Sequence, residues 1–195
     1  MVRSSVYRKL GGLDNRFFAH MEEIDLCWRM QLEGYKVTIV PQSLVYHVGG
    51  GTLPATSPFK LFLNFRNNLL MLENNLAKTF ALEEYRNGKP FKTAAKRGIK
   101  RARRRIRARI CLDFMSAAVY LMTFRFDCFR SVYRAHKEYK VLATHPDADQ
   151  IKLYLQNYWN EATVTGIYRK WIVLQSMLKG SHIFNSIADK DFYKI

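Results

Sequence analysis

From residue 58 onward, apolar residues recur at steps of three and four, which is the spacing of one face of an α-helix. Pro58 suits the first turn of such a helix, because its missing N–H needs no partner there. The apolar positions that follow are Leu61, Phe62, Phe65, Leu69, Leu72 and Leu76. Amphipathic patterns continue over residues 112–142 and from about 166 to 178. The pattern predicts a mainly helical region over residues 58–195.

Residues 1–57 carry shorter and more mixed patterns. From Met21 to about Leu32 the apolar residues again have helical spacing, and Gly34 is a natural helix end. Tyr35–Val40 alternates apolar and polar residues and is rich in β-branched side chains, and Leu44–Val48 is a second apolar run, so each predicts a strand. A helix followed by two strands is typical of an α/β fold, which we expect for residues 1–57.

The charge is strongly positive. Thirty-two Lys and Arg residues against sixteen Asp and Glu residues give a net charge of +16. From Arg86 to Arg109, twelve of twenty-four residues are basic and none is acidic. Such a charge favours a polyanionic partner, which can be a membrane surface, a nucleic acid or a phosphorylated ligand.

The basic segment predicts a helix over residues 93–110 with a narrow apolar stripe formed by Ile99, Ile106 and Ile110. This pattern is typical of an interfacial helix on anionic lipid, so we expect an anionic membrane surface as partner. A solvated basic face without a partner is the plain alternative. A nucleic-acid-binding module is a further alternative, but the sequence has no recognised motif for base readout, so no specific nucleic acid is expected.

Cysteine usage and hydropathy give the expected compartment. Cys27, Cys111 and Cys128 are widely separated and lack the spacing of a zinc cluster or a disulfide framework. The N-terminus has no apolar signal-peptide core, and the longest uncharged apolar stretch, Phe114–Phe124, has 11 residues, too few to span a bilayer. We expect a cytoplasmic protein that lies peripherally on the inner face of the plasma membrane.

Three carboxylates, Glu22, Glu23 and Asp25, stand near the start of the first predicted helix. They suit general base catalysis, but acidic residues are also ordinary in a first helical turn, and Asp25 with Arg29 is a common i,i+4 pair. His47 precedes a run of three glycines, where an imidazole can ligate a metal or simply fill a structural role.

Four motifs in order over residues 10–52 resemble the second half of a family 2 glycosyltransferase catalytic domain. They are Gly-Gly-Leu-Asp-x-x-Phe-Phe, Glu-Glu-x-Asp-Leu-Cys-Trp-Arg, Gly-Tyr-x-Val and His-x-Gly-Gly-Gly-Thr. The segment 64–72 is also similar to bacterial members that build surface polysaccharides, including rhamnosyltransferases. Weaker similarity continues to about residue 169.

The resemblance implies an inverting transfer of a sugar from a nucleotide-sugar donor to a lipid-linked or polysaccharide acceptor, assisted by a divalent cation, Mg²⁺ or Mn²⁺. Glu23 maps to the catalytic base, with Glu22 as the fallback, and Asp25 maps to a position that orients the helix. His47 maps to the metal or diphosphate. The positions implied for substrate binding are Trp28, Arg29, Gly49, Gly50 and Arg66.

The family also has a nucleotide-binding half with an Asp-x-Asp motif, and nothing like it precedes Glu22. We therefore expect residues 1–57 to be a partial catalytic domain, the back half of a GT-A sheet, joined to a helical region over residues 58–195. The sequence predicts a C-terminal portion that is inactive without the missing half. The alternative is a noncatalytic basic module that binds a membrane surface or nucleic acid.

Overall fold

The computed structural model describes residues 1–46, 54, 57–168, 172, 175–176, 180, 187–193 and 195. The α-helices in this part of the chain are α1 (Ser4–Lys9), α2 (Glu22–Leu32), α3 (Pro58–Arg86), α4 (Phe91–Met122), α5 (Phe126–Leu142) and α6 (Ala148–Tyr158). Two short strands, β1 (Ile167–Tyr168) and β2 (Phe192–Tyr193), pair antiparallel, and a 3₁₀ turn (Asp189–Asp191) precedes β2.

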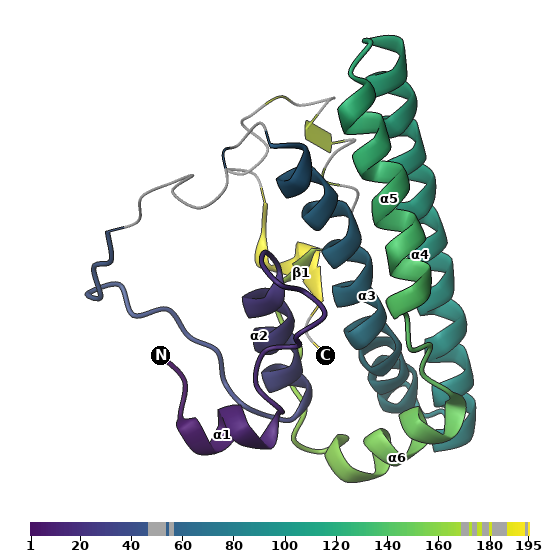
Figure 1. The fold of residues 1–195 in the computed structure, drawn as a ribbon. Helices are drawn as coiled ribbons and strands as arrows, with labels where there is room; N and C mark the ends of the chain where they lie inside the picture. The colour runs from purple at the N-terminus through teal and green to yellow at the C-terminus, as the bar shows by residue number, and fades with distance from the viewer. Residues whose placement is uncertain are drawn as a thin grey trace.

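The helices form a bundle around α3 (Figure 1). α4 runs antiparallel to α3, and α5 turns back along both of them to form a long hairpin with α4. α6 crosses the lower end of the bundle, and α2 packs on the opposite side of α3 from the hairpin. The predicted helix with proline in its first turn is confirmed, because α3 begins at Pro58.

α3 is buried along most of its length and supplies the core. Its lower half packs against α4 and α6 through Leu76, Phe80 and Ala81, and its upper half packs against α5 through Phe62. The contact with α4 is close because small residues line it. A Cβ atom added to Gly98 would lie 2.6 Å from the backbone nitrogen of Ala81, so only glycine fits at this point.

The basic segment of α4 packs differently from the prediction. Ile99 and Ala102 are buried in the core, and Ile106 and Ile110 pack partly against it. The apolar stripe therefore stabilises the bundle and is not available to lie on a lipid surface. The basic side chains on the other faces remain exposed for the most part, while Arg101 forms ion pairs with Glu83 and Glu84 of α3.

The prediction of an α/β fold with the back half of a GT-A sheet is wrong. The described residues are mostly helical, and their only β-pairing is the two-residue ladder between β1 and β2. Residues 35–46 form no strand, and the side chains of Ile39 and Tyr46 are each 90% exposed. A strand needs a neighbour for its backbone N–H and C=O groups, and no described segment pairs with these residues. Residues 47 and 48 lie outside the described part.

Candidate functional site

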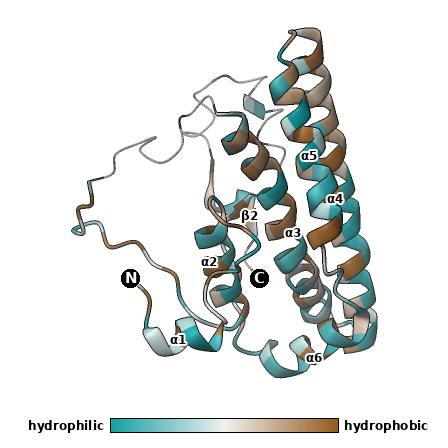
Figure 2. Cartoon of the chain, in the orientation of Figure 1, coloured by the Kyte–Doolittle hydropathy of each residue, from teal (hydrophilic) through white to brown (hydrophobic). Residues whose placement is uncertain are grey.

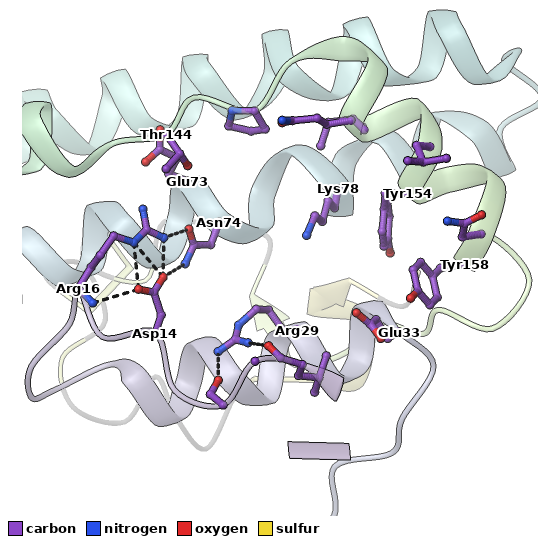
Figure 3. A pocket seen from close by; sticks show the side chains of 18 residues that line it. Asp14, Arg16, Arg29, Glu33, Glu73, Asn74, Lys78, Thr144, Tyr154 and Tyr158 are labelled. Carbon is purple, nitrogen blue, oxygen red and sulfur yellow. Dashed lines mark hydrogen bonds and ion pairs between the residues drawn. The ribbon is translucent and has the colours of Figure 1, made fainter. Parts of the chain in front are cut away.

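A cavity of about 610 Å³ lies between the loop over residues 10–16 and helices α2, α3 and α6 (Figure 3). Its volume is in the range of ordinary small-molecule sites. Twelve of its eighteen lining residues have polar or charged side chains. The polar and aromatic lining residues are Asp14, Arg16, Arg29, Glu33, Glu73, Asn74, Lys78, Thr144, Gln150, Tyr154, Asn157 and Tyr158.

One wall of the cavity is a hydrogen-bonded cluster formed by Asp14, Arg16 and Asn74. The Nε atom of Arg16 donates to both carboxylate oxygens of Asp14 at 2.9 and 3.0 Å, and Asn74 Nδ2 donates to the same carboxylate at 3.1 Å. Burial alone would raise the pKa of Asp14, but the hydrogen bonds from Arg16 and Asn74 hold it below its ordinary value. This wall therefore presents a fixed carboxylate, guanidinium and amide side by side.

A second network fixes the glycine-containing loop against α2. Asp25 is fully buried, and its carboxylate accepts hydrogen bonds from Arg29 Nε at 2.7 Å and from Asn75 Nδ2 at 2.8 Å. The other two guanidinium nitrogens of Arg29 donate to the carbonyls of Leu10 and Gly12 at 2.7 and 2.8 Å. The predicted i,i+4 pair is confirmed, and it holds the backbone that forms one edge of the cavity.

Lys78 projects from α3 into the cavity (Figure 3). Its ammonium lies over the ring of Tyr154, 5.4 Å from the centroid, and the Tyr154 hydroxyl donates to the carbonyl of Leu32 at 2.7 Å. Burial lowers the pKa of Lys78, and the charge of Arg29 lowers it further, against the opposing charges of Glu33 and Asp25.

Lys78 is also distinguished by its lack of an ion pair. Within the part of the chain that the structure describes, Arg16 pairs with Asp14 and Arg29 with Asp25, whereas no carboxylate lies within ion-pair distance of Lys78. Burying an ammonium without a counter-charge costs stability. The cavity is lined by three acidic and three basic side chains, and Lys78 is the cation among them that a negative charge on a ligand could pair with.

The loop that leads into α2 is held in an unusual conformation. Phe18, His20 and Met21 all have positive φ angles, of 65°, 69° and 75°. Asn67 of α3 donates to the carbonyls of Phe17, Ala19 and His20 at 2.7 to 2.9 Å. Non-glycine residues adopt such angles at a cost, and the hydrogen bonds from α3 compensate for it.

Arg66 of α3 also holds the loop that leads into α2. Its Nη2 atom donates to the carbonyls of Arg16 and Phe17 at 3.0 and 2.9 Å, its Nε donates to Asn67, and its Nη1 pairs with Glu138. The side chain is buried, so all three guanidinium nitrogens serve the protein itself. The structure places Arg66 under the loop before α2 and away from the cavity.

The two predicted base candidates stand at the first turn of α2. Glu23 is exposed, and Glu22 is half-buried with an Oε2 atom that is inaccessible and has no hydrogen-bond partner among the described residues. Neither lines the cavity. Helical spacing places Glu22 on the face of α2 that carries Asp25 and Arg29, while Glu23 lies about 100° further round.

Trp28 lies on a different face of α2 from the cavity. Its Nε1 atom donates to Thr79 Oγ1 at 3.0 Å, and its ring lines a separate cavity of about 260 Å³ with Leu72 and Phe80. The structure thus brings Asp25 and Arg29 together beside the larger cavity and separates Trp28 from them. His47, Gly49 and Gly50 lie outside the described residues.

A divalent cation needs several oxygen or nitrogen donors that converge on one point. No group of three or more His, Cys, Asp or Glu side chains in the described ranges is close enough to hold a metal ion. The carboxylates of Asp14 and Asp25 are already occupied by guanidinium and amide donors. Mg²⁺ and Mn²⁺ require several oxygen ligands, so these two carboxylates do not supply a cation site, and the expected cation stays a prediction because His47 lies outside the described residues.

Sequence reasoning missed Asn74, Lys78, Tyr154 and Tyr158 as cavity residues. One signal was present, because α3 carries Asn67, Glu73, Asn75 and Thr79 among apolar neighbours, and polar residues on a buried face need partners. The contribution of α6 had no signal, since only the fold brings residues 150–158 next to residues 10–16.

Searches against protein-family models, curated proteins and solved structures found no match to this chain.

Proposed function

We propose that this chain binds the acceptor in an inverting glycosyl transfer of the family 2 type, and that the cavity beside α2 is the acceptor site. The observation that carries the proposal is that Gly11, Gly12, Asp14 and Arg29, all from the resembling motifs, line one cavity together with α3 and α6. The nucleotide-sugar donor would be bound by a unit that the described residues do not include.

The chemistry of the cavity suits a carbohydrate. Sugar hydroxyls both donate and accept hydrogen bonds, so they match a wall in which a carboxylate, a guanidinium and an amide are fixed next to one another, as Asp14, Arg16 and Asn74 are. Tyr154 and Tyr158 stack at 5.6 Å between ring centroids and supply aromatic surface at the opposite end. Such surface can pack against the C–H face of a sugar ring.

Lys78 adds a requirement for negative charge. It is the cavity cation without an ion pair in the described ranges, so an acceptor with a carboxylate or phosphate would supply the missing counter-charge. This favours an acidic glycan or a lipid-linked sugar phosphate over a neutral sugar as the acceptor.

The proton of the attacking acceptor hydroxyl must go to a base. We assign this role to Glu23, with Glu22 as the alternative; neither lines the cavity, so the role requires the reacting hydroxyl to extend from the cavity to the start of α2. Asp25, Arg29, Arg66 and the loop that Arg66 supports would act as positioning groups, because they fix the direction from which α2 begins. The donor diphosphate would leave toward the donor-binding unit.

Isothermal titration of the purified chain with oligosaccharides tests the proposal. The panel contains an oligouronate, a sugar phosphate, neutral oligosaccharides of the same length and inorganic phosphate. We expect the anionic glycans to bind, and Lys78→Met to weaken this binding about tenfold, a loss typical of one charge-assisted hydrogen bond. Lys100→Met, at an exposed position of α4, is the matched control and should bind like the native chain. Equal binding by Lys78→Met, or no glycan binding by the folded chain, would overturn the proposal.

A further inference from the structure

The end of the α4–α5 hairpin projects beyond the rest of the bundle (Figure 1). α3 packs along the lower and middle parts of α4 and α5, whereas the last turns of α4 and the first turn of α5 extend past the beginning of α3. Helix ends that extend past their neighbours leave apolar side chains uncovered unless a partner covers them.

The uncovered side chains at this end are large and apolar. Phe124 is 79% exposed and Met122 70%, and residues 114–124 contain no charged side chain. The other exposed members of this apolar end are Phe114, Met115, Val119 and Phe126. Figure 2 shows hydrophobic colouring at the end of the hairpin next to hydrophilic colouring along the exposed faces below it.

Basic side chains surround the apolar end. On α4 the exposed residues Arg103, Arg104 and Arg107 lie below it, and on α5 Arg130 and Arg134 are exposed in the first turns. Long basic side chains can extend alongside apolar residues and place their charges at the level of lipid phosphates. The nearest acid on α4, Asp113, is buried and paired with Arg109, and the exposed Asp127 in the first turn of α5 is two residues from the exposed Arg125, so the charge around the apolar end stays positive.

We propose that the apolar end of the hairpin inserts into the surface of an anionic lipid bilayer, with the surrounding arginines on the lipid phosphates. The depth of insertion is limited, because the exposed Arg125 and Asp127 stand at the tip of the hairpin and Arg130 follows about 6 Å further along α5, so the apolar side chains enter the interfacial region of one leaflet. None of the described helices is long and apolar enough to cross a membrane. The contact surface is thus the hairpin end and not the apolar stripe of residues 93–110.

Charge complementarity favours an anionic bilayer as the partner of the hairpin end. A second copy of the chain would bring its own arginines against these arginines, and the chain as a whole has a net charge of +16. Nucleic acid would satisfy the arginines but would leave Met122 and Phe124 against a polar surface. An anionic bilayer offers both phosphates and an apolar interior. The proposal does not depend on the acceptor site, which lies among α2, α3 and α6.

Vesicle co-sedimentation tests the proposal with the full chain. Two kinds of vesicle are compared. One is phosphatidylcholine alone, and in the other about 30 mol% of the lipid is the anionic phosphatidylglycerol. We expect binding to the anionic vesicles only. Met122→Ser with Phe124→Ser should lower the partition coefficient at least about tenfold, because both changes remove apolar area that the bilayer would cover, without changing charge.

The matched control replaces two apolar residues elsewhere that are at least as exposed, Ile39→Ser with Val141→Ser, which should change the partitioning less than about twofold. Circular dichroism shows that each variant is folded.

Equal binding by both double variants, or no binding of the folded native chain to anionic vesicles, would overturn the proposal. Concentration-dependent dimerisation that Met122→Ser with Phe124→Ser abolishes would overturn it in favour of a second copy. Preference for nucleic acid over anionic vesicles would also overturn it. Glycan titration of the same variants shows separately whether the acceptor site is intact.

Discussion

The carboxylate of Asp25, which is fully buried, accepts a 2.7 Å hydrogen bond from Nε of Arg29 one helical turn away. The same guanidinium donates to the carbonyls of Leu10 and Gly12, so one ion pair joins α2 to the loop that edges the cavity. Asn75 of α3 completes the arrangement by donating to Asp25. The position of α2 relative to α3 therefore depends on a buried charge that is fully paired.

Asp25→Ala should lower the free energy of unfolding by about 3–5 kcal/mol, because it leaves the guanidinium of Arg29 buried without its partner. Urea unfolding followed by circular dichroism measures the change. Glu23→Ala is the matched control on the same helix. Glu23 is exposed, so its removal should change the stability by no more than about 0.5 kcal/mol. A similar stability for the two variants would show that the Asp25 network does not hold α2.

Lys78→Met should make the chain more stable at neutral pH, because the native protein holds a half-buried ammonium without an ion pair. A gain in stability together with a loss of anionic glycan binding would mark Lys78 as a functional residue. A variant less stable than the native chain would contradict this account.

The advantage of Lys78→Met should shrink as the pH rises. The pKa of Lys78 is lower in the folded chain than its ordinary value of 10.5, so between these two values the unfolded chain binds more protons and the native chain gains stability with pH. The pKa of Tyr154 is raised by burial, and its effect above pH 10 is present in both proteins and cancels in the difference. Thermal unfolding at pH 7, 9 and 10.5 measures the trend. A difference in stability that stays constant or grows with pH would contradict it.

Gly98→Ala should destabilise the chain by about 1–3 kcal/mol, the range typical of overpacking. Alanine is favoured over glycine in a helix by about 1 kcal/mol, but here its Cβ would meet the backbone of α3 at 2.6–2.7 Å. Ala118→Gly, at an exposed position of α4, is the control, and it should lose only the propensity difference. A stabilising effect of Gly98→Ala on the melting temperature would show that α3 and α4 are not in close contact.

Asp14→Asn should lower the stability at pH 7 by roughly 1–2 kcal/mol through the loss of charge-assisted hydrogen bonds from Arg16. The pKa of Asp14 is depressed in the folded chain, so the contribution of its carboxylate is present above about pH 4 and is lost as the pH falls further. Urea unfolding at pH 7, 5 and 3 should show a smaller difference between native chain and variant at pH 3 than at pH 5. A difference that does not depend on pH would contradict the assignment.

The helices could be predicted from the sequence because the apolar spacing that indicates a helix lies within the helix itself. The apolar spacing after Pro58 and the helix beginning near Glu22 are both present as expected. The strand expected over residues 35–40 has the right alternation, but a strand is completed by a neighbour, which periodicity alone does not provide. The basic helix also formed, yet its apolar stripe faces α3, because spacing identifies an apolar face and does not say what covers it.

The candidate site was predicted in part. Asp25 and Arg29 were expected together, and helical spacing alone brings them into contact. Arg66 was expected at the substrate, but its guanidinium is used by the loop before α2, since it is buried and its neighbours are backbone carbonyls. Lys78 and Tyr154 could not be paired from sequence, because 76 residues separate them and only the packing of α6 on α3 joins them.

The most direct test of the central claim is a two-dimensional ¹⁵N–¹H NMR titration of the chain with an anionic oligosaccharide. An acceptor in the proposed cavity should shift the backbone amides of Gly11 and Gly12 and the side-chain amide of Asn74, all of which line it. The side-chain NH of Trp28, which lies at the separate cavity, should stay unchanged. Shifts confined to Trp28 or to the exposed arginines of α4, with Gly11, Gly12 and Asn74 unaffected, would contradict the account.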